Sequence, residues 1–223
     1  QCHRRKAVIF NFETISKVRM NPQDPFYSIK YDNPVDTNYG IPIFWHYDNA
    51  ELSGKEEFKV IYKKIDEALK NTDPRYHILS LSVYGDFSLL GDVKDLFKDW
   101  PCKVMAKHIP RRHPYCYEKE CDAARPRKTK DPDPPSNMAV AEDIHLFTQR
   151  NDPPCNILLI NSDPDFDDLI KELAAAGYTV LLASYDDADP SLAKYAYFKW
   201  FWRLMRRGDG PLHYHRPAAV YFE

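Results

Sequence analysis

Two apolar runs in the sequence each lead into polar side chains that could hold a metal ion or move a proton. The groups are His46, Asp48 and Asn49 after IFW, and Asn161, Ser162, Asp163 and Asp165 after ILLI. Carboxylates are preferred ligands of Mg²⁺ and Mn²⁺, and such an ion can activate water for attack on a phosphodiester. Asp163 and Asp165 could face one ion, although Asp and Ser are also ordinary caps at the start of a helix.

The elements that would position these groups alternate along the chain. Apolar runs predict strands over residues 41–47, 78–84, 103–108, 156–161 and 178–183. Amphipathic segments predict helices over residues 55–70, 92–100, 138–147, 166–176 and 191–206. Such alternation is typical of an α/β fold, a three-layer α/β/α arrangement around a mostly parallel sheet. Ligands of these sheets bind at the carboxyl ends of the strands, where the two polar groups are expected.

Composition limits the classes of function. The chain has 223 residues, 43% of them hydrophobic, and a net charge of -2, which excludes a wholly disordered chain and gives no overall basic field for nucleic acid. Any polyanion would need a local basic patch. Five cysteines do not indicate a disulfide framework. With no signal-peptide pattern and no run of 18 apolar residues, we expect an intracellular, cytoplasmic protein that makes no membrane contact. The oligomeric state is not predicted.

The domain organisation follows from the position of the periodic segments. Residues 1–40 are rich in Pro, Asn and Asp and are interpreted as an N-terminal arm with at most one strand. A single domain is expected over residues 41–207, with a Pro-rich basic insertion at 109–136 and a tail at 208–223. Ser136 or Asn137 would cap the helix that follows the insertion.

The insertion carries two groups of residues with chemical potential. Arg111, Arg112 and Lys128 could bind phosphates of single-stranded RNA while neighbouring tyrosines stack on bases, or the segment could be a solvated run of charges. His108, His113, Cys116 and Cys121 are of zinc-binding types. Their spacing matches no common zinc finger, so incidental residues of a solvated loop are the favoured interpretation.

Three segments resemble the NYN domain of the PIN-like ribonuclease superfamily. LLINSDPDFDDLIKELAAAGYTVLLA resembles its signature S-G-D-x-D-F-x-x-L followed by G-Y-x-V-x-L, and IFWHYDNA resembles its opening strand V-F-W-D-x-E-N. DIHLFTQRNDPPCNILLIN is similar to the plant branch related to the meiosis regulator and mRNA stability factor family. The resemblance spans residues 41–206. It implies a PIN-like α/β fold, Mg²⁺ or Mn²⁺ bound by an aspartate cluster, and endoribonuclease activity in competent members. It also raises a peroxisomal association, which nothing else in the sequence supports.

The resemblance assigns roles residue by residue. Asp163 and Asp165 match the two aspartates of the last motif, Asp143 matches the second acidic position of the middle helix, and Asn49 matches the Asn of the first motif. These four would be catalytic, with Asp163 and Asp165 also holding the metal ion. Asn49 would position water or a phosphate.

Further candidates follow from geometry and from neighbouring motif positions. Residues two apart share a face of a strand, so Asp48 is expected beside His46, where both could reach the metal. Asn137 and Ser162 occupy motif positions at the same place and are expected to contact the substrate.

The sequence departs from the family pattern at charged positions. His46 stands where the family has its catalytic Asp, Asn137 where it has the earlier acidic residue of the middle helix, and Ser162 where it has Gly. Loss of two carboxylates weakens binding of a hard dication, and imidazole suits Zn²⁺ or Mn²⁺ better than Mg²⁺.

We therefore expect a protein that acts on RNA through an endoribonuclease-type fold whose catalytic site is weakened or lost. Mg²⁺ or Mn²⁺ would be needed only if activity remains. The alternative is a non-catalytic module on the same fold that binds RNA or a protein partner. Residues 7–14 (AVIFNFET) also resemble the opening motif, either as a decayed second copy or through similar composition.

Overall fold

The computed structural model describes residues 39–52, 54–88, 90, 93–110, 135–213 and 218. These residues belong to one unit, Val35–Glu223. The predicted N-terminal arm and the AVIFNFET segment lie outside the described residues, as do most of the basic insertion and the end of the tail.

Six parallel strands form one sheet in the order β3-β2-β1-β4-β5-β6. The strands are β1 (Gly40–His46), β2 (His77–Gly85), β3 (Lys103–His108), β4 (Asn156–Ile160), β5 (Thr179–Ser184) and β6 (Phe198–Phe201). β4 is buried along its whole length, which explains why its sequence is a continuous apolar run rather than an alternating one. The predicted α/β fold with a parallel sheet is confirmed.

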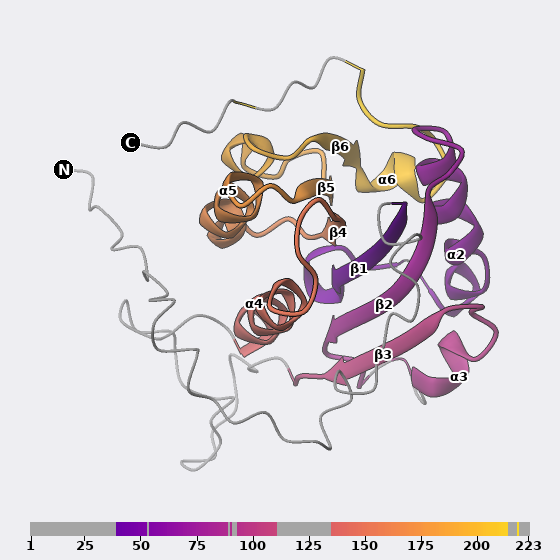
Figure 1. The fold of residues 1–223 in the computed structure, drawn as a ribbon. Helices are drawn as coiled ribbons and strands as arrows, with labels where there is room; N and C mark the ends of the chain where they lie inside the picture. Colours follow the sequence, from indigo (N-terminus) through magenta and orange to yellow (C-terminus); the bar gives the residue numbers. More distant parts are fainter. Residues whose placement is uncertain are drawn as a thin grey trace, which may run out of the picture. The chain divides into compact units, whose positions relative to one another are not determined.

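Helices cover both faces of this sheet (Figure 1). They are α2 (Lys55–Lys70), α3 (Val93–Phe97), α4 (Pro135–Thr148), α5 (Asp167–Ala175) and α6 (Trp202–Met205). Short 3₁₀ turns complete the connections: η2 (Tyr47–Asn49), η4 (Pro164–Phe166) and η5 (Pro190–Ala193). In Figure 1, α2 and α3 lie on one side of the strands and α4 and α5 on the other. Within the described ranges, none of the helices combines the length and apolar character that a membrane span requires.

Two local predictions are wrong. The predicted helix over 191–206 is instead η5, then β6, then the single turn α6. Its aromatic residues fit a helical period, but aromatic residues also favour strands, and Phe198–Phe201 pairs with β5 at the edge of the sheet. The helix predicted from residue 138 begins at Pro135, so Ser136 and Asn137 lie inside its first turn rather than capping it.

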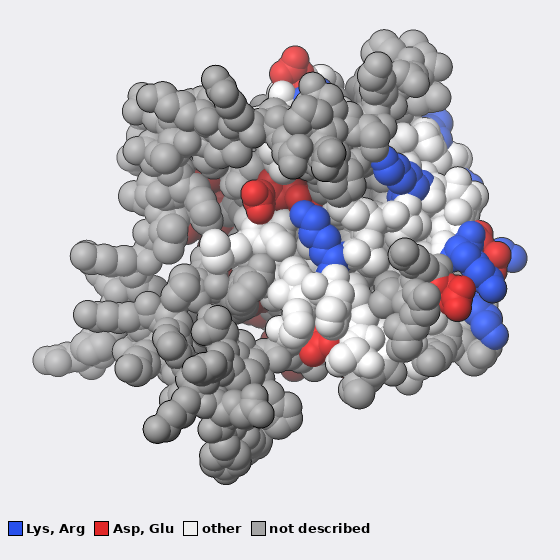
Figure 2. All heavy atoms as spheres, turned by 90° about the horizontal axis from the view of Figure 1, so that it is seen from below, with Lys and Arg blue, Asp and Glu red and all other residues white. Residues whose placement is uncertain are grey.

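Charged side chains are dispersed over the surface. On the face shown in Figure 2, the described Lys and Arg side chains lie in small separate groups, several of them next to Asp or Glu. Ion pairs among the described residues include Arg203 with Asp186 and Arg206 with Glu57. The described residues on this face therefore form no continuous basic surface.

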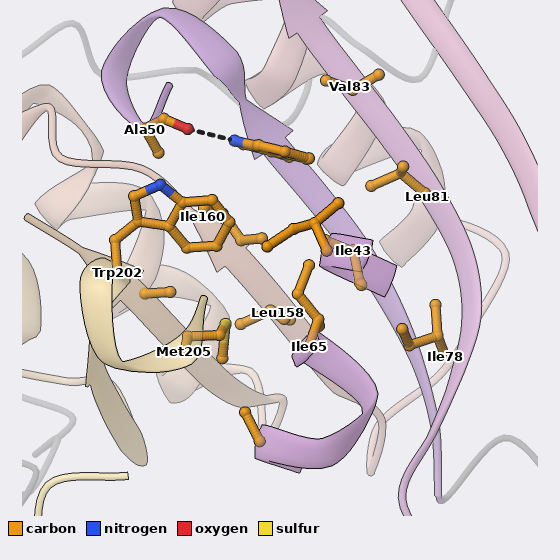
Figure 3. Packing of buried hydrophobic residues seen from close by; sticks show 14 of the residues in the cluster. Ile43, Ala50, Ile65, Ile78, Leu81, Val83, Leu158, Ile160, Trp202 and Met205 are labelled. Atoms are coloured by element: carbon orange, nitrogen blue, oxygen red, sulfur yellow. Dashed lines mark hydrogen bonds between the residues drawn. The ribbon is translucent and has the colours of Figure 1, made fainter. Parts of the chain in front are cut away.

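The larger core lies between the sheet and α2 and is rich in aromatic rings (Figure 3). Trp45 of β1 packs edge-on against Trp202, with ring centroids 5.2 Å apart. The Trp45 indole N–H donates a hydrogen bond to the Ala50 carbonyl (3.0 Å), and the Trp202 indole N–H donates to the Glu51 carbonyl (3.2 Å). This core thus anchors the segment that directly follows Asn49.

Candidate functional site

The two polar groups meet at the point where the strand order reverses. β1 and β4 are neighbours in the sheet, but the chain continues from β1 to β2 on one side and from β4 to β5 on the other. In open parallel sheets this arrangement places ligands outside the carboxyl ends of the two central strands. His46 ends β1, and Asn161 directly follows β4.

A row of polar side chains crosses the same edge of the sheet. His46 pairs in register with Tyr84 of β2, and Tyr84 with Lys107 of β3. Equivalent positions of neighbouring strands share a face, so the three side chains lie on one face of the sheet. This is the face that α4 covers, as shown by the ring contact between Phe44 of β1 and Phe147 of α4.

Asp143 of α4 is held by two members of this row. Its side chain is 1% exposed, and the Lys107 ammonium lies 2.8 Å from Oδ1 and 2.7 Å from Oδ2. The Tyr84 hydroxyl donates a 2.6 Å hydrogen bond to Oδ2. Burial raises the pKa of the Asp143 carboxyl, and the hydrogen bonds from Lys107 and Tyr84 act in the opposite direction. Burial and the charge of Asp143 also hold the pKa of Tyr84 well above its usual value, so the phenol stays a donor.

A chain of hydrogen bonds links Asp163 to His46. The Asp163 backbone N–H donates to Asn161 Oδ1 (3.0 Å), which sets the orientation of that amide. Asn49 Nδ2 must therefore be the donor to the same oxygen (3.1 Å), and it lies 2.9 Å from His46 Nδ1. With the Asn49 amide in this orientation, its N–H points at His46 Nδ1. An imidazole thus occupies the position that would hold a carboxylate in the family that the sequence resembles.

Asp163 has a hydrogen bond on each carboxylate oxygen. Oδ1 accepts from the Asp165 backbone N–H (3.1 Å), so Asp163 is the N-cap of the turn η4. Oδ2 accepts from Asn137 Nδ2 (2.9 Å), which joins the start of α4 to the end of β4. Asp165 is exposed. The motif aspartate therefore performs the capping role that the sequence left open.

Two buried amide atoms in this network have no hydrogen-bond partner among the described residues: Asn161 Nδ2 and Asn137 Oδ1. Asn161 is 0% exposed and Asn137 is 4% exposed. One atom is a donor and the other an acceptor.

The Asp48 side chain contacts the end of β2. The chain enters the turn η2 at Tyr47, so strand alternation does not extend to Asp48. Its Oδ1 accepts a 3.1 Å hydrogen bond from the Asp86 backbone N–H. The carboxyl also contacts Gly85, which has φ +151, and a Cβ there would lie 3.0 Å from Asp48 Oδ1. A glycine at this place allows the close approach.

The remaining predicted site residues are divided between the edge of the sheet and the insertion. Ser162 Oγ accepts a 2.8 Å hydrogen bond from the Tyr185 backbone N–H and so links the ends of β4 and β5. Arg111, Arg112 and Lys128 lie outside the described residues, as do three of the four residues of the zinc alternative. The fourth, His108, accepts a 3.1 Å hydrogen bond from the Phe87 backbone N–H.

Lys107 and Tyr84 are the site residues that sequence reasoning missed. Both lie at the carboxyl ends of predicted strands, which is the same signal that identified His46 and Asp163. Lys107 follows KVMA, and Tyr84 follows ILSLSV. Examining the residues at the carboxyl end of every predicted strand, rather than of the two strands that are followed by acidic residues, would have identified both.

The donor set does not fit a divalent ion. No three His, Cys, Asp or Glu side chains gather in a possible metal-binding group within the part of the chain that the structure describes. The carboxylate of Asp143 contacts an ammonium group, His46 Nδ1 is hydrogen-bonded to Asn49, and Asp48 Oδ1 accepts from the Asp86 backbone N–H.

No protein-family model matches the chain, and no curated protein matches it. The NYN resemblance therefore depends on the sequence motifs alone.

Proposed function

We propose that the chain is a PIN-like NYN domain that acts on RNA through a catalytic site that has been weakened or lost. Three observations support this function. The motif residues Asn49 and Asp163 come from distant parts of the sequence and join one hydrogen-bond network, and Asp143 lies on α4, the helix that also supplies Asn137 to this network. The network lies at the reversal of the strand order, where parallel sheets bind ligands. Its charged and amide groups are suited to polar substrates.

The observation that carries the proposal is the ion pair between Asp143 and Lys107. The carboxylate assigned to the acidic cluster is neutralised within the protein, and the neighbouring motif positions hold the neutral residues His46 and Asn137. Because affinity for a hard dication follows the number of ligand charges, Mg²⁺ or Mn²⁺ would bind weakly here. Asp163 and Asp165 are the carboxylates that remain at the end of β4 for any residual activity.

Binding of single-stranded RNA would depend on the insertion. The described residues on the face shown in Figure 2 form no continuous basic area, and the basic residues Arg111, Arg112 and Lys128 would supply contacts to phosphates. A protein acting on RNA in this way would be intracellular and cytoplasmic. The family resemblance adds peroxisomal association as an alternative location.

Cleavage of a labelled single-stranded RNA in Mn²⁺, Mg²⁺ or EDTA tests the catalytic part. We expect no metal-dependent cleavage above the level of the Asp163→Asn/Asp165→Asn variant. Cleavage that needs the metal and disappears in that variant would show a working nuclease and contradict the loss of the site.

Fluorescence anisotropy with the same RNA at low salt tests binding. Replacing Arg111, Arg112 and Lys128 by Ala should weaken binding at least about tenfold and flatten its salt dependence. The matched control replaces the exposed Lys63, Lys98 and Lys171 by Ala, an identical change in net charge. Equal losses in both triple variants would show a general charge effect, and no binding by the wild type would leave a protein partner as the alternative.

A further inference from the structure

We propose that Lys107 is a built-in cation, whose ammonium group takes the place beside Asp143 that a divalent metal ion would occupy. This inference deepens the proposed function, because it rests on Asp143 being an acidic position of an ancestral metal site. It explains how the site stabilises the buried carboxylate of Asp143 without a metal ion.

The contacts of Asp143 are those of a carboxylate that needs a counter-charge. A buried carboxylate is costly unless it is paired and hydrogen-bonded. Here the ammonium lies within 2.8 Å of both oxygens, and the side chain is 1% exposed. The third contact, from the Tyr84 hydroxyl, is a neutral hydrogen bond. Lys107 therefore supplies the positive charge in this contact set.

The register of the sheet places this ammonium group. Lys107 pairs with Tyr84, and its Nζ lies 5.8 Å from the centroid of the Tyr84 ring. Its side chain is 33% exposed, so it reaches the buried carboxylate from the rim of the site. The fold sets this ion pair, because Lys107 lies on β3 and Asp143 lies on α4, the helix that covers this face of the sheet.

Lys107 and a metal ion exclude one another at this place. Mg²⁺ binds oxygen at about 2.0–2.1 Å and needs an open side of the carboxylate. The ammonium contacts both oxygens at 2.7 and 2.8 Å, so it covers the side that a bidentate ion would approach. A dication on the same oxygens would also repel the ammonium charge at close range.

Mn²⁺ binding to a set of variants tests the inference without using RNA, so it can fail or succeed independently of the proposed function. Lys107→Met should bind Mn²⁺ at least about tenfold more tightly than the wild type, because the carboxylate is released as a ligand. Two controls should bind Mn²⁺ no more tightly than the wild type: Lys107→Arg, which keeps the charge, and Lys103→Met, which changes a lysine on the same strand. Lys107→Met/Asp143→Asn should lose the gain. Electron paramagnetic resonance of bound Mn²⁺ and the Mn²⁺-dependent shift in Tm measure the effect.

The outcomes decide the question even where a variant folds poorly. If Lys107→Met is unfolded in EDTA, Mn²⁺ should restore its far-UV circular dichroism, and no rescue would overturn the inference. Wild-type protein that binds Mn²⁺ and loses this binding in Asp143→Asn would also overturn it, since metal and ammonium would then share the carboxylate. An equal gain in Lys103→Met would show a nonspecific charge effect and reject a special role for Lys107.

Discussion

Adjacent residues of β1 belong to two different environments. Trp45 points into an aromatic core between the sheet and α2, whereas His46 points to the opposite face and joins a network of amides and a carboxylate. The first region is apolar and closely packed, and the second is polar and held by directed hydrogen bonds. The comparison shows that the aromatic face stabilises this edge of the sheet. The opposite face can therefore carry buried polar and charged side chains, which are costly to bury.

The largest expected effect is on the aromatic face. Trp202→Ala should destabilise the protein by about 3–5 kcal/mol, because it leaves a cavity beside Trp45 and removes the hydrogen bond to Glu51. Urea unfolding measures the free energy. The control is Tyr197→Ala, since this ring is 56% exposed and its removal should cost only about 0.5 kcal/mol. Similar costs for both variants would contradict the division between the faces.

The next effect is on the polar face. Lys107→Met should cost about 2–3 kcal/mol at neutral pH, a value reduced from that of a fully buried pair because Lys107 is 33% exposed. The pKa of Asp143 is already raised by burial, and loss of Lys107 should raise it further. The folded state of the variant then binds the proton more tightly than the unfolded state. Its stability should therefore fall as the pH rises from about 3.8 through the folded-state pKa.

The comparison with wild type at low pH is the check on this prediction. The difference in stability between Lys107→Met and the wild type should become small at a pH low enough for Asp143 to be protonated in both the folded and the unfolded state. A difference that does not depend on pH would mean that Lys107 acts through packing of its side-chain carbons rather than through its charge.

Removing the carboxylate should cost less than removing the lysine. Asp143→Asn replaces a buried charge by an amide of the same shape, whose oxygen still accepts from Tyr84, and Lys107 can turn to solvent. We expect a change within about 1 kcal/mol in either direction. Urea unfolding of the two variants in parallel measures the asymmetry, and a larger loss for Asp143→Asn would contradict it.

The smallest effect concerns His145, which lies on α4 and is 8% exposed. Burial lowers the pKa of its imidazole from 6.5, so the unfolded state takes up the proton first as the pH falls. Stability should therefore decrease as the pH falls through 6.5 towards the folded-state pKa. His145→Gln should remove this part of the pH dependence in thermal unfolding curves. An unchanged slope would assign the dependence to other groups.

Much of the fold could be predicted because its elements alternate in sequence and carry clear periodicity. The helix over residues 55–70 and the strand over 103–108 were predicted with the bounds that the structure has. The segment 191–206 could not be predicted, since its aromatic spacing fits a helix and only pairing with β5 makes residues 198–201 a strand. Tertiary context decides such edge strands.

The sequence predicted that these side chains lie at the carboxyl edge of the sheet, but it did not predict their ion pairs and hydrogen bonds. Strand ends identified His46 and Asp163, and the motif order added Asn49 and Asp143. The partnership of Asp143 with Lys107 depends on the strand order and register, which no local pattern contains. The contact of Asp48 with the end of β2 depends on a 3₁₀ turn that begins directly after β1.

The affinity of wild-type protein for single-stranded RNA, measured in EDTA and again in Mn²⁺, tests most directly the claim that this site needs no metal. Equal affinity in both buffers, with the RNA recovered intact, is the predicted result. RNA binding that requires Mn²⁺, or RNA that is cut only when Mn²⁺ is present, would contradict the account.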